Sequence, residues 1–87
     1  MHARKFFIQN NTKIAYMQHE ELIKLGQHIK KLRKEKKLTL SALCYRNGLE
    51  PSTVSRIEAG IVEAKYLTLL KLAKAFNIKI SELLDFQ

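Results

Sequence analysis

From position 20 onward, apolar residues recur along the chain at the spacing of an α-helix. Four of them fall at i, i+3, i+7 and i+10, namely Leu22, Leu25, Ile29 and Leu32. This spacing places them in one stripe on a helical surface. Lys30, Lys34 and Lys37 lie along a different face. The pattern predicts a helix over residues 20–36 with one apolar side and one charged side.

Two short helices are expected next. Thr39 is a residue type that caps helix N-termini, so a second helix is predicted over residues 40–47. Gly48 then supplies a left-handed residue that ends it. A third helix opens at Pro51, which is tolerated in a first turn because its missing N–H would be unpaired there in any case. Gly60 ends this third helix.

The rest of the chain is also predicted to be helical. Residues 66–76 carry a dense apolar pattern and are followed by Asn77, a plausible C-cap. Residues 81–84 resemble a capped final turn or short helix. No strand is needed after residue 20. We therefore expect an all-α domain.

The first residues have a different composition. Lys5–Gln9 and Thr12–Tyr16 have the composition of two short strands, and Asn10 and Asn11 between them tolerate the positive φ of a tight turn. A lone hairpin is marginal in water, so a disordered arm is the alternative. Residues 1–19 are accordingly expected to be an N-terminal arm, either a short β-hairpin or disordered, and residues 20–87 the folded domain.

Composition and charge narrow the function. A chain of 87 residues forms one domain, and its net charge of +8 points to a polyanionic partner, most often nucleic acid. The excess charge lies in residues 1–37, whereas residues 38–60 carry two bases and two acids. No apolar run is long enough for a membrane span and no secretory signal is recognisable, so a cytoplasmic protein is the default. No cofactor motif, metal-ligand spacing or nucleophile–base pair is present, which argues against an enzyme. Cys44 is expected to be a small buried apolar residue.

The second and third predicted helices are joined by about three residues, Gly48 to Glu50, and this arrangement is a helix-turn-helix. In such a unit the second helix can enter the DNA major groove with its N-terminal half. Val54 and Ile57 must face the core. The outward positions are then Pro51, Ser52, Ser55 and Arg56, with Thr53 at the edge.

The stretch Leu38–Gly60 resembles the lambda-repressor-like, Cro/cI-type helix-turn-helix of the XRE family. The resemblance extends back to Gly26–Arg33 and forward through Leu69–Phe76 and Ile80–Leu84, so it covers roughly residues 22–85. It implies a five-helix lambda-repressor-like fold in which the third helix is the recognition helix.

Carried over by position, the resemblance implies that bases are read by Pro51, Ser52, Ser55 and Arg56, with Thr53 beside them. Arg56 is the strongest candidate, because an outward Arg can contact guanine O6 and N7 together. DNA phosphates would be met by Thr39 and the start of the second helix at Leu40, and by Lys37 and Lys65. Arg33 and Glu58 hold positions that form an ion pair in several relatives.

Some positions depart from the family pattern. Leu40 stands where relatives usually have Gln, which removes a side chain that braces phosphate. Pro51 can offer only apolar contact, for instance to a thymine methyl. These departures concern base reading and leave the fold unaffected.

The sequence therefore predicts a small transcriptional regulator, most simply a repressor, which binds double-stranded DNA as a homodimer through its C-terminal surface or its arm. Two alternatives remain. One is an antitoxin-like module that binds a toxin protein as well as its own promoter, suggested by the unusual arm. The other is a helix-turn-helix scaffold that has lost DNA reading, suggested by Leu40 and Pro51.

Overall fold

The computed structural model describes the backbone of residues 2–86 and the side chains of residues 18–86. It contains five helices in that range: α1 (His2–Glu35), α2 (Leu40–Cys44), α3 (Pro51–Glu58), α4 (Tyr66–Phe76) and α5 (Ile80–Leu83). No strand occurs among residues 2–86. The all-α, five-helix prediction is confirmed.

The N-terminal hairpin prediction is wrong. The backbone of residues 2–19 continues the first helix, which has 34 residues instead of beginning at position 20. Extending an existing helix adds one hydrogen bond for each residue fixed, whereas a separate hairpin must close its own turn. At about 1.5 Å per residue the helix is about 51 Å long. It accounts for the 55 Å long axis of the molecule.

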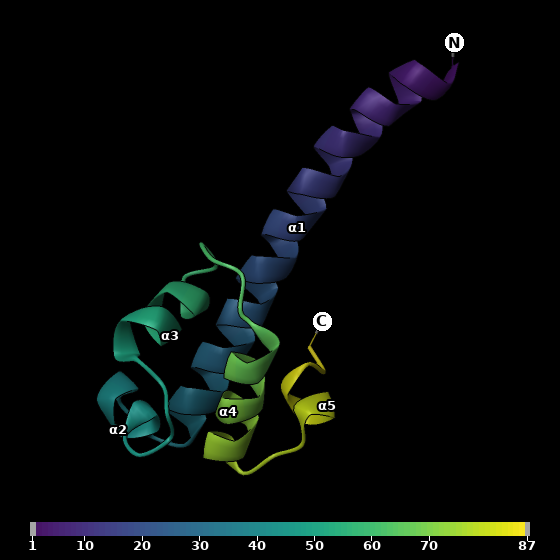
Figure 1. Ribbon diagram of the computed structural model, residues 1–87. Helices are drawn as coiled ribbons and strands as arrows, with labels where there is room; N and C mark the ends of the chain where they lie inside the picture. The colour runs from purple at the N-terminus through teal and green to yellow at the C-terminus, as the bar shows by residue number, and fades with distance from the viewer. Residues whose placement is uncertain (1, 87) are drawn as a thin grey trace.

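The other four helices pack around the second half of α1. Figure 1 shows the first half of α1, drawn in purple, leading away from them, while α2 and α3 lie together on one side and α4 and α5 on the other. The arm thus consists of helix that is continuous with the domain.

All five helices contribute to one core. Its buried side chains are Leu25, Ile29, Leu43, Cys44, Val54, Ile57, Leu72, Ala73, Phe76 and Leu83. Seven of these side chains are at most 2% exposed, and Phe76 is the largest of the seven. Leu22 and Leu32, at the two ends of the predicted stripe on α1, are half-buried. The predicted stripe is therefore the core-facing side of α1.

A close approach of backbones fixes α3 against α1. A Cβ added to Gly26 of α1 would lie 2.5 Å from the carbonyl oxygen of Glu58 and nearer still to that of Ile57. A Cβ on Gly60, just after α3, would lie 2.8 Å from the Cα of Ile23. Only glycine, which has no Cβ, allows the two backbones to come this close. The C-terminal end of α3 is consequently held against α1.

Helix ends differ in how well the sequence predicted them. Asn77 ends α4 in the left-handed conformation with φ 58°, as expected for a C-cap. α2 is shorter than predicted, because it ends at Cys44 and the chain turns at Arg46, which has φ 62°. Gly48 also has a positive φ, of 67°, but lies within the turn that follows.

Candidate nucleic-acid interface

The two faces of α3 differ sharply. Val54 is 0% exposed and Ile57 is 2% exposed, so both anchor the helix in the core. On the opposite side lie four exposed residues, Pro51, Ser52, Ser55 and Arg56. The structure thus brings these predicted residues together on one outward surface. Thr53 is half-buried, and its hydroxyl donates to the Glu50 carboxylate at 3.4 Å.

The start of α2 is built as the sequence suggested. The Thr39 hydroxyl accepts a hydrogen bond of 3.0 Å from the backbone N–H of Ala42, which caps the helix. Leu40 is half-buried and packs against the core. Its side chain therefore contributes to stability.

The lysines predicted to meet phosphate lie next to helix ends. Lys37 is exposed in the turn between α1 and α2, with φ 56°. Lys65 is the exposed N-cap residue of α4. Both amines are free to approach a polyanion from the ends of helices.

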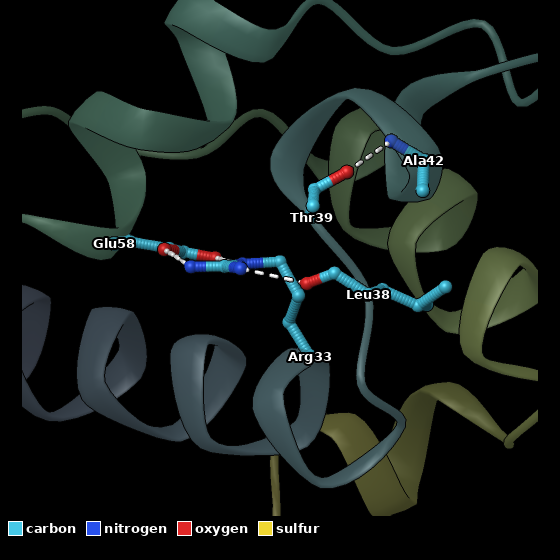
Figure 2. A network of polar contacts seen from close by, with 5 residues as sticks. All are labelled: Arg33, Leu38, Thr39, Ala42 and Glu58. Carbon is cyan, nitrogen blue, oxygen red and sulfur yellow. Dashed lines mark hydrogen bonds and ion pairs between the residues drawn. The ribbon is translucent and has the colours of Figure 1, made fainter.

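A guanidinium connects three parts of the domain. Figure 2 shows Arg33 of α1 reaching the Glu58 carboxylate at the end of α3 and the Leu38 carbonyl before α2. Arg33 Nε and Nη2 donate to the two Glu58 oxygens at 2.8 and 3.0 Å, and Nη1 donates to the Leu38 oxygen at 2.8 Å. The two side chains are only 11% and 6% exposed. The hydrogen bonds to Glu58 raise the pKa of Arg33 above its ordinary value.

This bidentate pair positions α3. The contacts with Gly26 and Arg33 hold the C-terminal end of α3 against α1. The pair occupies the two positions that the family resemblance indicated. The pair supports the candidate interface from the side of α3 that faces α1, and it is not part of the exposed surface.

Cys44 has the environment expected of a small buried residue. It is 5% exposed, and burial raises the pKa of its thiol, with a smaller contribution from the nearby Glu58 charge. The thiol is therefore held protonated and away from solvent.

Sequence reasoning did not single out two exposed residues that lie between α2 and α3. The Arg46 guanidinium lies over the ring of Tyr45, with its central carbon 5.2 Å from the ring centroid. Tyr45 is 68% exposed. A cation next to an aromatic residue just after a helix was the available signal, but adjacency in sequence does not by itself predict stacking.

Neither metal clusters nor membrane helices stand out in the part of the chain that the structure describes. No three His, Cys, Asp or Glu side chains gather into a metal-sized group there. Among the described helices, none combines the length and apolar character that crossing a membrane requires.

Comparison with known proteins identifies the class. A helix-turn-helix family model matches residues 29–83, which include α2, α3 and α4. The chain belongs to the XRE-type helix-turn-helix family of DNA-binding transcription regulators.

Two solved structures are similar to the chain. The first is the restriction-modification controller protein C.AhdI from Aeromonas hydrophila, with 36% sequence identity and a TM-score of 0.70. The match covers 74% of this chain and 97% of that one. The second is the clp gene regulator ClgR from C. glutamicum, with a TM-score of 0.67, which covers 74% of this chain and 83% of that one. At 23% identity it supports the fold alone. No curated protein matches the chain significantly.

Proposed function

We propose that the protein is a repressor that reads an operator in double-stranded DNA by inserting α3 into the major groove. The observation that carries this proposal is the division of α3 into a buried side and an exposed side of small and cationic residues. Small side chains at Ser52 and Ser55 let the helix approach the base edges closely. Arg56 then supplies a bidentate contact to guanine, which contributes about 1–3 kcal/mol of discrimination.

The DNA backbone is contacted by the elements that flank α3. Thr39 and the backbone at Leu40 present the N-terminal end of α2 to a phosphate, and Lys37 and Lys65 approach from the neighbouring turns. Residues 20–87 form the DNA-binding unit, and residues 1–19 are an arm to it. The protein acts in the cytoplasm on nucleoid DNA.

The active species is a homodimer formed through the C-terminal surface. Much of the apolar C-terminus closes the core, since Leu83 is 0% exposed and Ile78, Ile80 and Phe86 are half-buried. Leu84 remains 44% exposed after α5, and Leu67 remains 67% exposed at the start of α4. A partner subunit covering these side chains would remove apolar surface from water. Two α3 helices about 34 Å apart match a palindromic site. The side chains of the alternative interface, Phe6 to Ile8, lie outside the residues whose side chains are described.

The relative C.AhdI, described as a restriction-modification controller protein, suggests the setting. The two proteins are 36% identical over a match that covers 97% of the C.AhdI chain, so we propose the same role for this protein. The operator would then lie upstream of the genes that it controls.

The test is selection of bound sequences from a pool of random duplexes, at low and at near-physiological salt. Enrichment of a two-fold-symmetric site that survives the higher salt is expected. Binding that enriches nothing and disappears with salt would leave only phosphate attraction and would overturn the proposal. Arg56→Ala should then lose preference at particular positions of the site while the protein keeps its fold. Lys74→Ala on α4, which removes an exposed cation away from α3, serves as the matched control.

A further inference from the structure

Five residues of the described backbone have a positive φ, and their identities form a pattern. Two are glycines, and Asn77 is a residue type that tolerates this conformation. The other two, Lys37 and Arg46, are cations with φ of 56° and 62°. Other residues with a Cβ are disfavoured in the left-handed region, so glycine or asparagine would be the less strained choice at both positions. The two cations stand on either side of α2.

Lys37 has a structural reason to be a cation. It follows the C-terminus of the long helix α1. Its backbone N–H donates to the carbonyl oxygen of Lys34, and the backbone N–H of Leu38 donates to the carbonyl oxygen of Arg33. A positive charge at the C-terminal end of a helix interacts favourably with its macrodipole. Arg46 follows α2, which has only five residues, so the same explanation is weak there.

The side chain of Arg46 is held in place without being neutralised. It lies on the ring of Tyr45, 5.2 Å from the centroid, and both residues are exposed. Among the described side chains, the ion pairs are those of Lys24 with Glu21 and of Arg33 with Glu58. Arg46 thus offers a preorganised guanidinium, and guanidinium groups bind phosphate oxygens in a bidentate manner.

The position of Arg46 relates it to the candidate interface. It lies in the turn between α2 and α3, five residues before the first residue of α3, Pro51. Figure 1 shows α2 and α3 side by side, so this turn lies beside the helix that we place in the major groove. The phosphates of the two strands border that groove on both sides. We propose that Arg46, held on the ring of Tyr45, contacts a DNA phosphate next to the recognition helix. This inference rests on the proposed function.

The test compares two substitutions to glycine, each at a residue in the left-handed conformation, where glycine relieves backbone strain. Arg46→Gly removes the guanidinium, whereas Asn77→Gly changes a left-handed residue at the far end of α4 and serves as the control. The probe is a labelled duplex of about 20 base pairs that carries the selected site, titrated between about 50 and 200 mM salt. For Arg46→Gly the slope of log affinity against log salt should fall by about one unit, while the thermal midpoint stays equal or rises. Arg46→Lys should keep the slope because it keeps the charge.

Tyr45 provides a second variant for the positioning role. Tyr45→Ala should weaken duplex binding several-fold with an unchanged salt slope, and Tyr45→Phe should restore the affinity because the ring is retained. An unchanged slope for Arg46→Gly, or an equal loss for Asn77→Gly, would overturn the inference. If the unsubstituted protein fails to bind the duplex even at the lowest salt, the proposed function itself fails.

Discussion

Replacing Gly26 by Ala should destabilise the protein, although alanine is the better helix former. The added Cβ would lie 2.5 Å from the Glu58 carbonyl oxygen and nearer to that of Ile57. Ordinary C···O contacts are no shorter than about 3.3 Å, so α3 would have to move by roughly 0.8 Å or more. The obstacles are backbone atoms at the end of α3, which no side-chain rotation can relieve.

The magnitude follows from two opposing effects. Overpacking a filled interior costs about 1–3 kcal/mol, with the upper part of the range appropriate for a backbone clash. Replacing glycine by alanine within a helix gains about 1 kcal/mol. The net expectation is a loss of about 2 kcal/mol, which corresponds to a fall of about 10 °C in the thermal midpoint of a domain of this size.

Denaturant unfolding followed by circular dichroism measures this loss as a lower midpoint at an unchanged slope. Gln27→Ala, at the next and exposed position, is the control and should change stability by no more than about 0.5 kcal/mol. A Gly26→Ala protein that melts at a higher temperature than the parent would show that α1 and α3 do not approach this closely, and the reasoning would be refuted.

Two further perturbations address the polar junction and the buried thiol. Arg33→Met should lower the free energy of unfolding by about 3 kcal/mol, because it leaves the Glu58 carboxylate buried without its partner. Adding Glu58→Met should recover part of that loss. Additive losses in a double-mutant cycle would argue against the pair. The raised pKa of Cys44 means that the unfolded chain releases this proton before the folded chain does as pH rises. Stability should therefore decline above about pH 8.5, the ordinary thiol range. Cys44→Ala should remove that part of the decline in pH-dependent unfolding, and identical profiles for the two proteins would contradict the assignment.

Periodicity predicted most of the domain because its helices bury one face each. The apolar positions of α1 and α4, such as Ile29 and Phe76, fall at helical spacing and are buried as that spacing requires. Terminators were harder. Gly48 takes the left-handed conformation as expected, but Arg46, two residues earlier, takes it as well, and α2 has already ended at Cys44. Local propensity does not reveal that a residue with a Cβ will take this strained conformation.

Features that depend on tertiary contact were not accessible in the same way. The composition of residues 5–16 favoured short strands, but these residues continue α1 as helix. The local pattern gave no signal for the role of Gly26, because that role depends on the carbonyl groups of Ile57 and Glu58, 31 and 32 residues later. The pairing of Arg33 with Glu58 was indicated by family resemblance, since a spacing of 25 residues has no periodic meaning. The outward residues of α3 followed directly once Val54 and Ile57 were assigned to the core.

The anchoring of α3 along one side has an evolutionary consequence. Val54, Ile57 and Glu58 hold the helix on its inner side, whereas its four exposed residues lie on the opposite side. Substitutions at positions such as 52 and 55 therefore leave the core undisturbed, because neither side chain lies within it. A lineage carrying this domain can drift among surface sequences on α3 without passing through unfolded intermediates. Divergence of this surface is thus separated from the selection that maintains the fold.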